Sequence, residues 1–171
     1  MGPAPFLAER YALEPPESAQ GPLALERLPR DEAERLGALF AGIDPWARYA
    51  YPASRLAAYF ARKEPGAPRF GLFAGPEIAG VVGLRLEWLK GPYLQFLGVL
   101  PGFQRRGFGA AVLAWLEREA RTGEERNLWV LASDINAGAI RLYERHGFAR
   151  VASLDDLACE GHAEVMLRKR L

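Results

Sequence analysis

The residues best suited to chemistry lie in a short basic stretch that contains two glycines. Gln104, Arg105 and Arg106 precede Gly107 and Gly109, where an apolar strand-like run gives way to a helical pattern. The first amide groups of a helix have no partner within the helix, and the helix dipole adds partial positive charge there. Glycine lets the backbone approach an anion closely, and arginine adds charge. The stretch therefore predicts an anion site suited to a phosphate.

Other phosphate-binding loops must be compared with this stretch, because two glycines at a strand-to-helix turn are weak evidence alone. The Walker A pattern ends in Gly-Lys-Ser/Thr, and no such ending occurs here. The dinucleotide-binding fingerprint requires a third glycine where Ala111 and Val112 stand. The residues present therefore exclude both the Walker A loop and the dinucleotide-binding loop.

Hydrophobic periodicity predicts the elements that must position this stretch. Asp31 is the expected N-cap of a helix with Leu36, Leu39 and Phe40 on one face. The predicted order is β-α-α-β-β-β-α-β-α-β-β, which indicates one mixed sheet with helices on its faces. Strands are expected at 23–28, 70–74, 78–88, 93–100, 128–132, 151–154 and 163–167, and further helices at about 45–63, 108–120 and 137–145.

Two spaced signatures resemble those of the GCN5-related N-acetyltransferases. The pattern Gln104-x-x-Gly107-x-Gly109-Ala110 resembles the acyl-CoA pyrophosphate loop of that family. The resemblance extends from about residue 22 to the C-terminus, and within the family it is strongest to the branch that acetylates ribosomal proteins and N-terminal amines. The family's second signature is similar to the pattern Asn136…Ala139-Ile140…Leu142-Tyr143-Glu144…Gly147-Phe148.

The resemblance implies an α/β fold in a single domain. A central mixed, mostly antiparallel sheet of about seven strands is expected, flanked by about four helices. Two parallel strands, 93–100 and 127–132, should splay apart at their ends. The N-acetyltransferase domain is expected to span residues 21–171. Residues 1–20 contain four prolines and are expected to form a loosely ordered extension.

The resemblance also implies acetyl-CoA as cosubstrate and a set of residues that bind it. Its pantetheine arm is expected in the gap between the splayed strands, and its pyrophosphate on the amides of residues 105–110. Tyr143 is the candidate general acid for the leaving thiolate, because a phenol pKa of ~10 is not far above a thiol pKa of ~8.5. The expected cofactor-binding residues are Leu97, Gly98, Val99, Gln104, Arg105, Arg106, Gly107, Phe108, Gly109, Ala110, Asn136 and Tyr143.

A general base is the part of the family pattern that the sequence lacks. Relatives often place a glutamate on one of the two splayed strands, but the corresponding positions here are Tyr93 and Leu131. An acceptor ammonium with a pKa of up to ~10.4 must still lose a proton. The sequence therefore predicts deprotonation through water, or by a carboxylate elsewhere such as Glu87 or Asp134.

Composition limits the classes of partner. The chain has 171 residues, with 22 Lys+Arg against 21 Asp+Glu, so neither a nucleic acid nor an anionic membrane is expected as a partner. The single cysteine, Cys159, excludes an intramolecular disulfide and a cysteine-rich zinc site, and no metal is predicted. A Cys159–His162 nucleophile is disfavoured because no third orienting group is evident. A cytoplasmic location is predicted, and a homodimer is left open.

The leading functional hypothesis is direct, acetyl-CoA-dependent N-acetylation of a primary amine on a peptide or a small molecule. The competing hypothesis is a non-catalytic acyl-CoA-binding module, which the missing carboxylates motivate. The acceptor is not predicted, although a site without a base would favour amines of low pKa such as a peptide N-terminus. An aromatic-rich segment is expected to serve mostly in packing and partly as a wall of the acceptor groove: Trp46, Tyr49, Tyr51, Tyr59 and Phe60.

Overall fold

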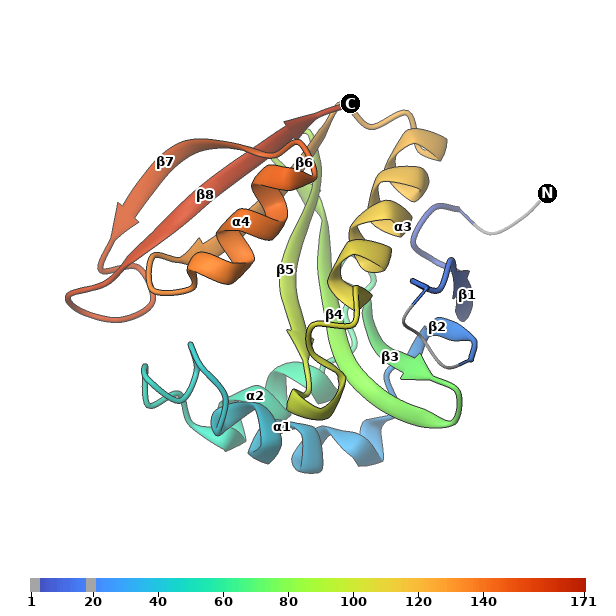
Figure 1. The fold of residues 1–171 in the computed structure, drawn as a ribbon, viewed down its shortest axis with the longest axis horizontal. Helices are drawn as coiled ribbons and strands as arrows, with labels where there is room; N and C mark the ends of the chain where they lie inside the picture. The colour runs from blue at the N-terminus through green and yellow to red at the C-terminus, as the bar shows by residue number, and fades with distance from the viewer. Residues whose placement is uncertain (1–3, 18–20) are drawn as a thin grey trace.

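The computed structural model describes residues 4–17 and 21–171. They form one eight-stranded sheet in the order β1-β2-β3-β4-β5-β6-β8-β7, with helices on both faces (Figure 1). All neighbouring strands are antiparallel except β5 and β6. The strands are β1 Arg10–Leu13, β2 Leu23–Arg27, β3 Arg69–Ala74, β4 Glu77–Trp88, β5 Gly91–Val99, β6 Asn127–Ser133, β7 Ala149–Asp155 and β8 Ala163–Arg170. The helices are α1 Ala33–Ala41, α2 Ala53–Ala61, α3 Phe108–Thr122 and α4 Ala137–Arg145, with single 3-10 turns at Arg30–Glu32 and Pro101–Phe103.

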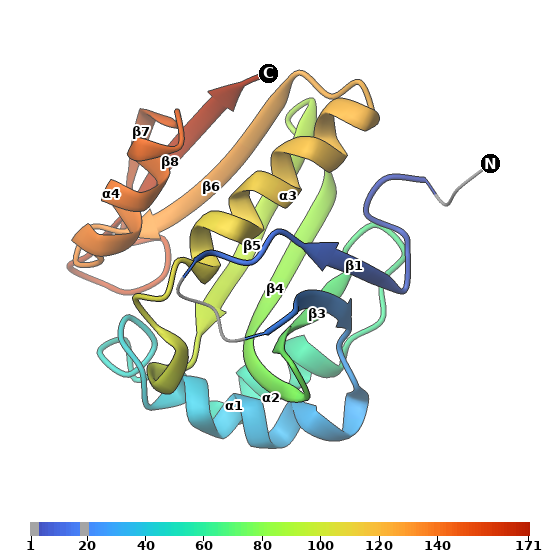
Figure 2. The same ribbon diagram turned by 45° about the vertical axis from the view of Figure 1, so that its right-hand side comes forward.

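Two hydrophobic cores cover the two faces of the sheet. Helix α3 runs across one face (Figure 2), and its apolar residues at four-residue intervals are buried there: Phe108, Val112, Leu116 and Ala120. Helices α1 and α2 enclose a second core, in which Phe40 and Phe60 pack against Phe96 of β5. Both faces of the central strands are therefore covered, as the predicted layer arrangement requires.

The two parallel strands separate soon after they meet. Strands β5 and β6 pair only at Tyr93 with Trp129 and at Leu94 with Val130. Directly after Leu94 the register of β5 against β4 shifts, which leaves Gln95 as an extra residue. Such a bulge bends a strand and increases its twist. The predicted splaying is thus confirmed, and the bulge marks the point where β5 turns away from β6.

The N-terminal segment differs from its prediction in the residues that the structure describes. Arg10–Leu13 form strand β1, which pairs with β2, and Phe6 is 3% exposed. Phe6 and Tyr11 both pack their rings against Trp115 of α3. Residues 4–17 are therefore not a loose extension but supply an eighth strand and part of the core. The predicted extension also includes 1–3 and 18–20, which lie outside the described residues.

The other predicted elements agree with the structure apart from local details. Asp31 lies in a 3-10 turn, and Glu32 occupies the N-cap of α1 without a side-chain cap bond. Leu39 is 43% exposed, so only Leu36 and Phe40 of the predicted face are buried. Helix α4 has the predicted bounds, and Gly147 follows it with φ 85°. Within residues 4–17 and 21–171, no helix is long and apolar enough to cross a membrane.

Candidate active site

One cleft of about 690 Å³ brings together nearly all the residues that the sequence singled out. It is lined by the end of β5, the loop and first turn of α3, helix α4 with its N-cap, and the segment 43–46 after α1. Its volume lies within the range common for small-molecule sites. The predicted residues that line it are Leu97, Gly98, Val99, Gln104, Arg105, Gly107, Phe108, Gly109, Ala110, Asn136 and Tyr143.

The loop before α3 presents uncapped amide groups to this cleft. The first helical bond runs from the amide of Ala111 to the carbonyl of Gly107, and no side chain caps the helix. Arg105 and Gly107 have φ of 62° and 80°, the left-handed conformation that is common in anion-binding backbone turns. The Nε2 of Gln104 donates to the Val99 carbonyl over 2.9 Å, which ties the loop to the end of β5. The loop is thus held in a shape suited to a phosphate.

Two residues of the loop have surroundings that differ from those expected. Arg106 does not line the cleft, and its guanidinium lies 5.6 Å from the ring centroid of Phe103. A Cβ at Gly109 would meet Leu142 Cδ2 at 2.9 Å. Gly109 therefore allows α3 and α4 to approach each other at the cleft. The sequence reasoning had explained this glycine by close approach to an anion.

The free edge of β5 supplies backbone groups to the same cleft. The amide of Leu100 donates to the carbonyl of Ala79 on the β4 side. Bonding sides alternate along an antiparallel pair, so Gly98 also bonds toward β4 while Leu97 and Val99 direct their groups the other way. The carbonyl of Val99 already accepts the hydrogen bond from the side chain of Gln104. The amide of Val99 and both backbone groups of Leu97 thus face the gap where β6 has moved away.

Tyr143 lies where the cleft joins a second, smaller pocket. It lines both and is itself only 6% exposed, with its ring 5.8 Å from that of Phe148. Burial raises the pKa of its hydroxyl above the ordinary value. The group therefore stays protonated at neutral pH and acts as a hydrogen-bond donor, whereas full loss of its proton is harder than the sequence argument assumed. Asn136 lines both spaces as well, while its Oδ1 caps α4 by accepting from the Ala139 amide over 3.1 Å.

The second pocket has a volume of about 180 Å³, and six of the seventeen residues that line it are aromatic. Tyr93 and Leu131, the positions at which relatives often carry a glutamate, both line it. Of the aromatic segment, Trp46, Tyr49 and Tyr51 line the pocket. The remaining two aromatic residues, Tyr59 and Phe60, pack behind it against Phe96.

A carboxylate that the sequence reasoning did not single out also lines this pocket. Glu164, the second residue of β8, pairs with Ser133, the last residue of β6. A carboxylate elsewhere was one of the two predicted routes for deprotonation, and neither splayed strand supplies the one found here. Glu87 is exposed and lines neither space, and Asp134 at the edge pairs with His162 over 3.6 Å.

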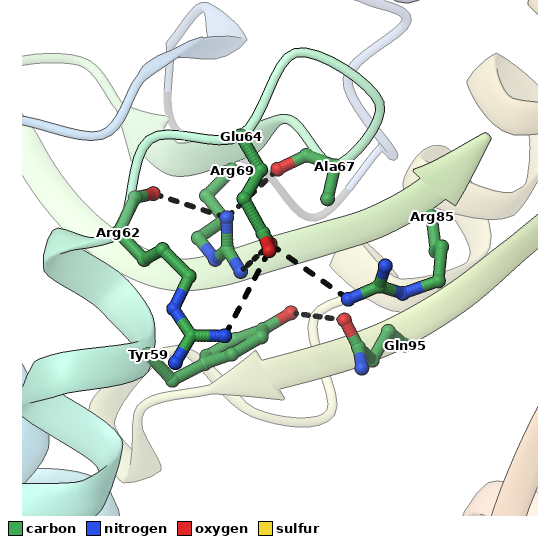
Figure 3. A network of polar contacts seen from close by, with 7 residues as sticks. All are labelled: Tyr59, Arg62, Glu64, Ala67, Arg69, Arg85 and Gln95. Carbon is green, nitrogen blue, oxygen red and sulfur yellow. Dashed lines mark hydrogen bonds and ion pairs between the residues drawn. The ribbon is translucent and has the colours of Figure 1, made fainter.

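A buried arginine supports the wall of the pocket formed by β5. Arg69, 5% exposed, donates to the carbonyls of Arg62 and Ala67 and to Glu64, and its guanidinium lies 4.3 Å from the ring centroid of Tyr59 (Figure 3). The hydroxyl of Tyr59 in turn donates to Gln95 Oε1 over 3.2 Å. Burial raises the pKa of Tyr59 to about 12, so it remains a donor. The bulged residue Gln95, which lines the pocket, is thereby fixed in orientation.

No arrangement for covalent catalysis accompanies the pocket in the part of the chain that the structure describes. Cys159 directs its Sγ to the carbonyl of Glu160, and His162 faces Asp134 and the ring of Tyr49. The two side chains of the disfavoured Cys-His pair thus have other neighbours. The polar groups that line the two spaces include hydroxyl, amide and carboxylate groups.

Comparison with known proteins gives a family match over most of the chain. The sequence model described as the acetyltransferase (GNAT) family matches residues 26–148. A search of curated proteins finds no match. The matched range includes the loop before α3 and all of α4, and it ends before β7 and β8.

Solved structures with a similar fold cover most or all of the domain. An acetyltransferase from Salmonella typhimurium that modifies the N-terminal serine of ribosomal protein L7/L12 is 17% identical, with 92% of this chain and 99% of that chain covered and a TM-score of 0.71. An acetyltransferase from Thermus thermophilus is 21% identical, with coverages of 87% and 97% and a TM-score of 0.68. A protein described as a streptothricin acetyltransferase from Bacillus anthracis, solved with acetyl coenzyme A, is 16% identical, with coverages of 64% and 65% and a TM-score of 0.57. At these identities the likeness shows the fold.

Proposed function

The chain belongs to the acetyltransferase (GNAT) family, and from this membership we propose that it is an acetyl-CoA-dependent N-acetyltransferase. The acceptor in this proposal is a primary amine of a peptide or small molecule. The observation that carries it is the continuity of two spaces at Tyr143: the cleft bordered by the α3 loop, and the aromatic pocket with its carboxylate. A bound cosubstrate and an acceptor would meet there.

The residues present fit acetyl-CoA. The uncapped first turn of α3 and the charge of Arg105 suit a pyrophosphate. The free amide of Val99 and the free carbonyl of Leu97 suit the amides of a pantetheine arm, which would extend the sheet edge as a strand does. When bound there, acetyl-CoA would supply the acetyl group as a reactive thioester.

In the proposed mechanism, the chain contributes position and two polar groups. The bulge at Gln95 opens the gap that would align the two reactants, and such alignment can account for a large part of a rate enhancement. The hydroxyl of Tyr143 would donate to the leaving sulfur, and its raised pKa keeps the proton in place until then. The amide of Leu97, a residue that lines both spaces, would be the donor suited to a developing oxyanion.

The alternative of a non-catalytic acyl-CoA-binding module loses its motivation in this structure. That hypothesis depended on the absence of carboxylates at Tyr93 and Leu131. Glu164 provides one in the same pocket from a third strand.

The predicted cytoplasmic location, the absence of a nucleic-acid partner and the oligomeric state stay predictions.

Titration calorimetry with CoA and acetyl-CoA, together with turnover against a panel of amines and mass detection of the product, tests the proposal. Binding of CoA by the folded protein and a mass gain of one acetyl group on an amine are expected. A folded protein that prefers ATP or NADH to CoA would contradict the cofactor assignment. CoA binding without turnover of any amine would favour the binding-module alternative.

A further inference from the structure

One cluster of polar side chains bridges the pocket from three separate parts of the chain. The hydroxyl of Tyr49, in the segment between α1 and α2, shares a hydrogen bond with Ser133 Oγ at the end of β6. It also donates to Glu164 Oε1 at the start of β8 over 3.1 Å. The segment that carries Tyr49 is thereby fastened across the pocket to the strands on the far side of the gap.

The Glu164 side chain is half-buried, and the hydrogen-bond donor that reaches it, the Tyr49 hydroxyl, carries no charge. No lysine, arginine or histidine of the described residues forms an ion pair with it. It is also the only charged side chain among the described residues that line the pocket. A partly buried carboxylate without a cation is costly and becomes more stable when a positive group reaches it.

The groups that face Glu164 from the neighbouring elements leave it short of positive charge. Tyr49 approaches from the loop, Tyr93 from β5 and Asp134 from the end of β6. Burial raises the pKa of Glu164, the Tyr49 bond lowers it, and Asp134 raises it again. His162, two residues before Glu164 in the chain, pairs with Asp134 and lies against the Tyr49 ring.

We propose that Glu164 receives the ammonium group of the acceptor, and that this group takes the place of the Tyr49 hydroxyl. One proton then moves from the ammonium nitrogen to a Glu164 oxygen, which leaves a lone pair on the amine and a neutral carboxylic acid. The acid returns its proton to water before the next turnover. This inference rests on the proposed function and adds the residue that binds and deprotonates the acceptor.

The same charge pattern defines the class of acceptor. A polyamine would bring further ammonium groups into aromatic surroundings that hold one carboxylate. A free amino acid would bring a carboxylate to a pocket that has no cation among its described lining residues. The carboxylate would lose hydration without a partner, and the further ammonium groups would meet aromatic faces, which stabilise a cation less than a second carboxylate would. The pocket therefore suits a single ammonium on an otherwise neutral group, such as the N-terminus of a peptide.

Four variants separate these roles when the acceptor is a tripeptide amide with a free N-terminus. Glu164→Gln should raise the acceptor KM at least tenfold and remove the acidic limb of the kcat/KM profile, which reports the free enzyme, while CoA affinity stays within a few-fold. That limb should lie above the ordinary glutamate pKa of about 4.5 and be followed by a plateau, because the ionised form accepts the proton. Glu87→Gln is the charge-matched control, and its KM should equal that of the wild type.

Tyr49→Phe tests the competition for Glu164. Removing the hydroxyl should lower the acceptor KM several-fold and move the acidic limb to higher pH, because the bond from Tyr49 lowers the Glu164 pKa. Ser133→Ala removes the other bond of Tyr49 but keeps the one to Glu164, so it should not lower the KM. An equal decrease in both variants would show a loosened loop and overturn the competition.

The choice of acceptor gives an independent result. The tripeptide amide should exceed spermidine and free glycine at least tenfold in kcat/KM, and a preference for spermidine would overturn the single-ammonium class. An unchanged KM and pH profile in Glu164→Gln would overturn the role of Glu164. Failure of the wild type to bind CoA would contradict the proposed function instead. Calorimetry of the tripeptide amide with the CoA-bound protein tests the role of Glu164 without turnover. The inference is contradicted if the wild type does not bind the tripeptide amide, or if Glu164→Gln binds it equally well.

Discussion

Removal of the Tyr143 hydroxyl is the sharpest test of the mechanism. In Tyr143→Phe the ring and its edge contact with Phe148 are retained. No hydrogen bond of the hydroxyl occurs among the described residues, so the free energy of unfolding should change by less than about 1 kcal/mol. Loss of the donor to the leaving sulfur should lower kcat on the order of 10²-fold, which corresponds to about 2.7 kcal/mol of activation free energy.

The assay is steady-state turnover combined with a single-turnover measurement that shows chemistry to be rate-limiting. CoA affinity, measured by calorimetry, should stay within a few-fold of the wild type. Tyr11→Phe is the matched control, because Tyr11 packs on Trp115 and Phe70 and lines neither the cleft nor the pocket. An unchanged kcat in Tyr143→Phe would leave Tyr143 as a packing residue and refute its role as donor.

Two further substitutions test the elements that build the site. Gly107→Ala should lower the free energy of unfolding by about 1–2 kcal/mol and weaken CoA binding, because φ is 80° and the new Cβ would lie 2.9 Å from Pro16 Cβ. Urea unfolding and calorimetry measure the two effects. The control is Gly102→Ala, whose new Cβ would meet open space. Asn136→Ala should destabilise the protein by about 1 kcal/mol in the same unfolding assay through loss of the cap bond to Ala139, and no change would show that the cap does not contribute.

Local patterns were sufficient to predict the elements that carry the cosubstrate residues. Four buried positions of α3 repeat at helical spacing, and α4 begins after a capping asparagine and ends before a glycine. These signals depend on neighbours along the chain, which a sequence displays directly. The loop between β5 and α3 could be predicted for the same reason. Its roles in binding remain predictions that the experiments above address.

The features that sequence reasoning missed all depend on partners far along the chain. The extra residue at Gln95 exists only relative to the register of β4. Strand β1 is four residues long and becomes recognisable only when it pairs with β2. Prolines before and after it favour the interpretation as an extension, which proved wrong for the described residues.

Glu164 was missed because its own strand gives no hint of a site. In β8 the buried Val165 and Leu167 alternate with more accessible residues, and a charged residue at one of these accessible positions ordinarily faces solvent. What places Glu164 in the pocket is its pairing with Ser133, at the end of the strand that leaves β5. A search for carboxylates on β5 and β6 alone therefore could not find it.

The gap in the sheet explains how donor and carboxylate come to serve one pocket from different elements. Because β5 and β6 pair at only two positions, the edge of β5 stays free for a ligand, while β6 keeps its full pairing with β8. That pairing carries Glu164 to the far wall, and α4, which follows β6, brings Tyr143 to the junction of the two spaces. A single departure from regular pairing thus opens the cleft and sets the places of both groups. If β5 and β6 paired along their full length, the edge of β5 would no longer be free and the site would close. The separation of the two strands is therefore a requirement of the site and not a fault in packing.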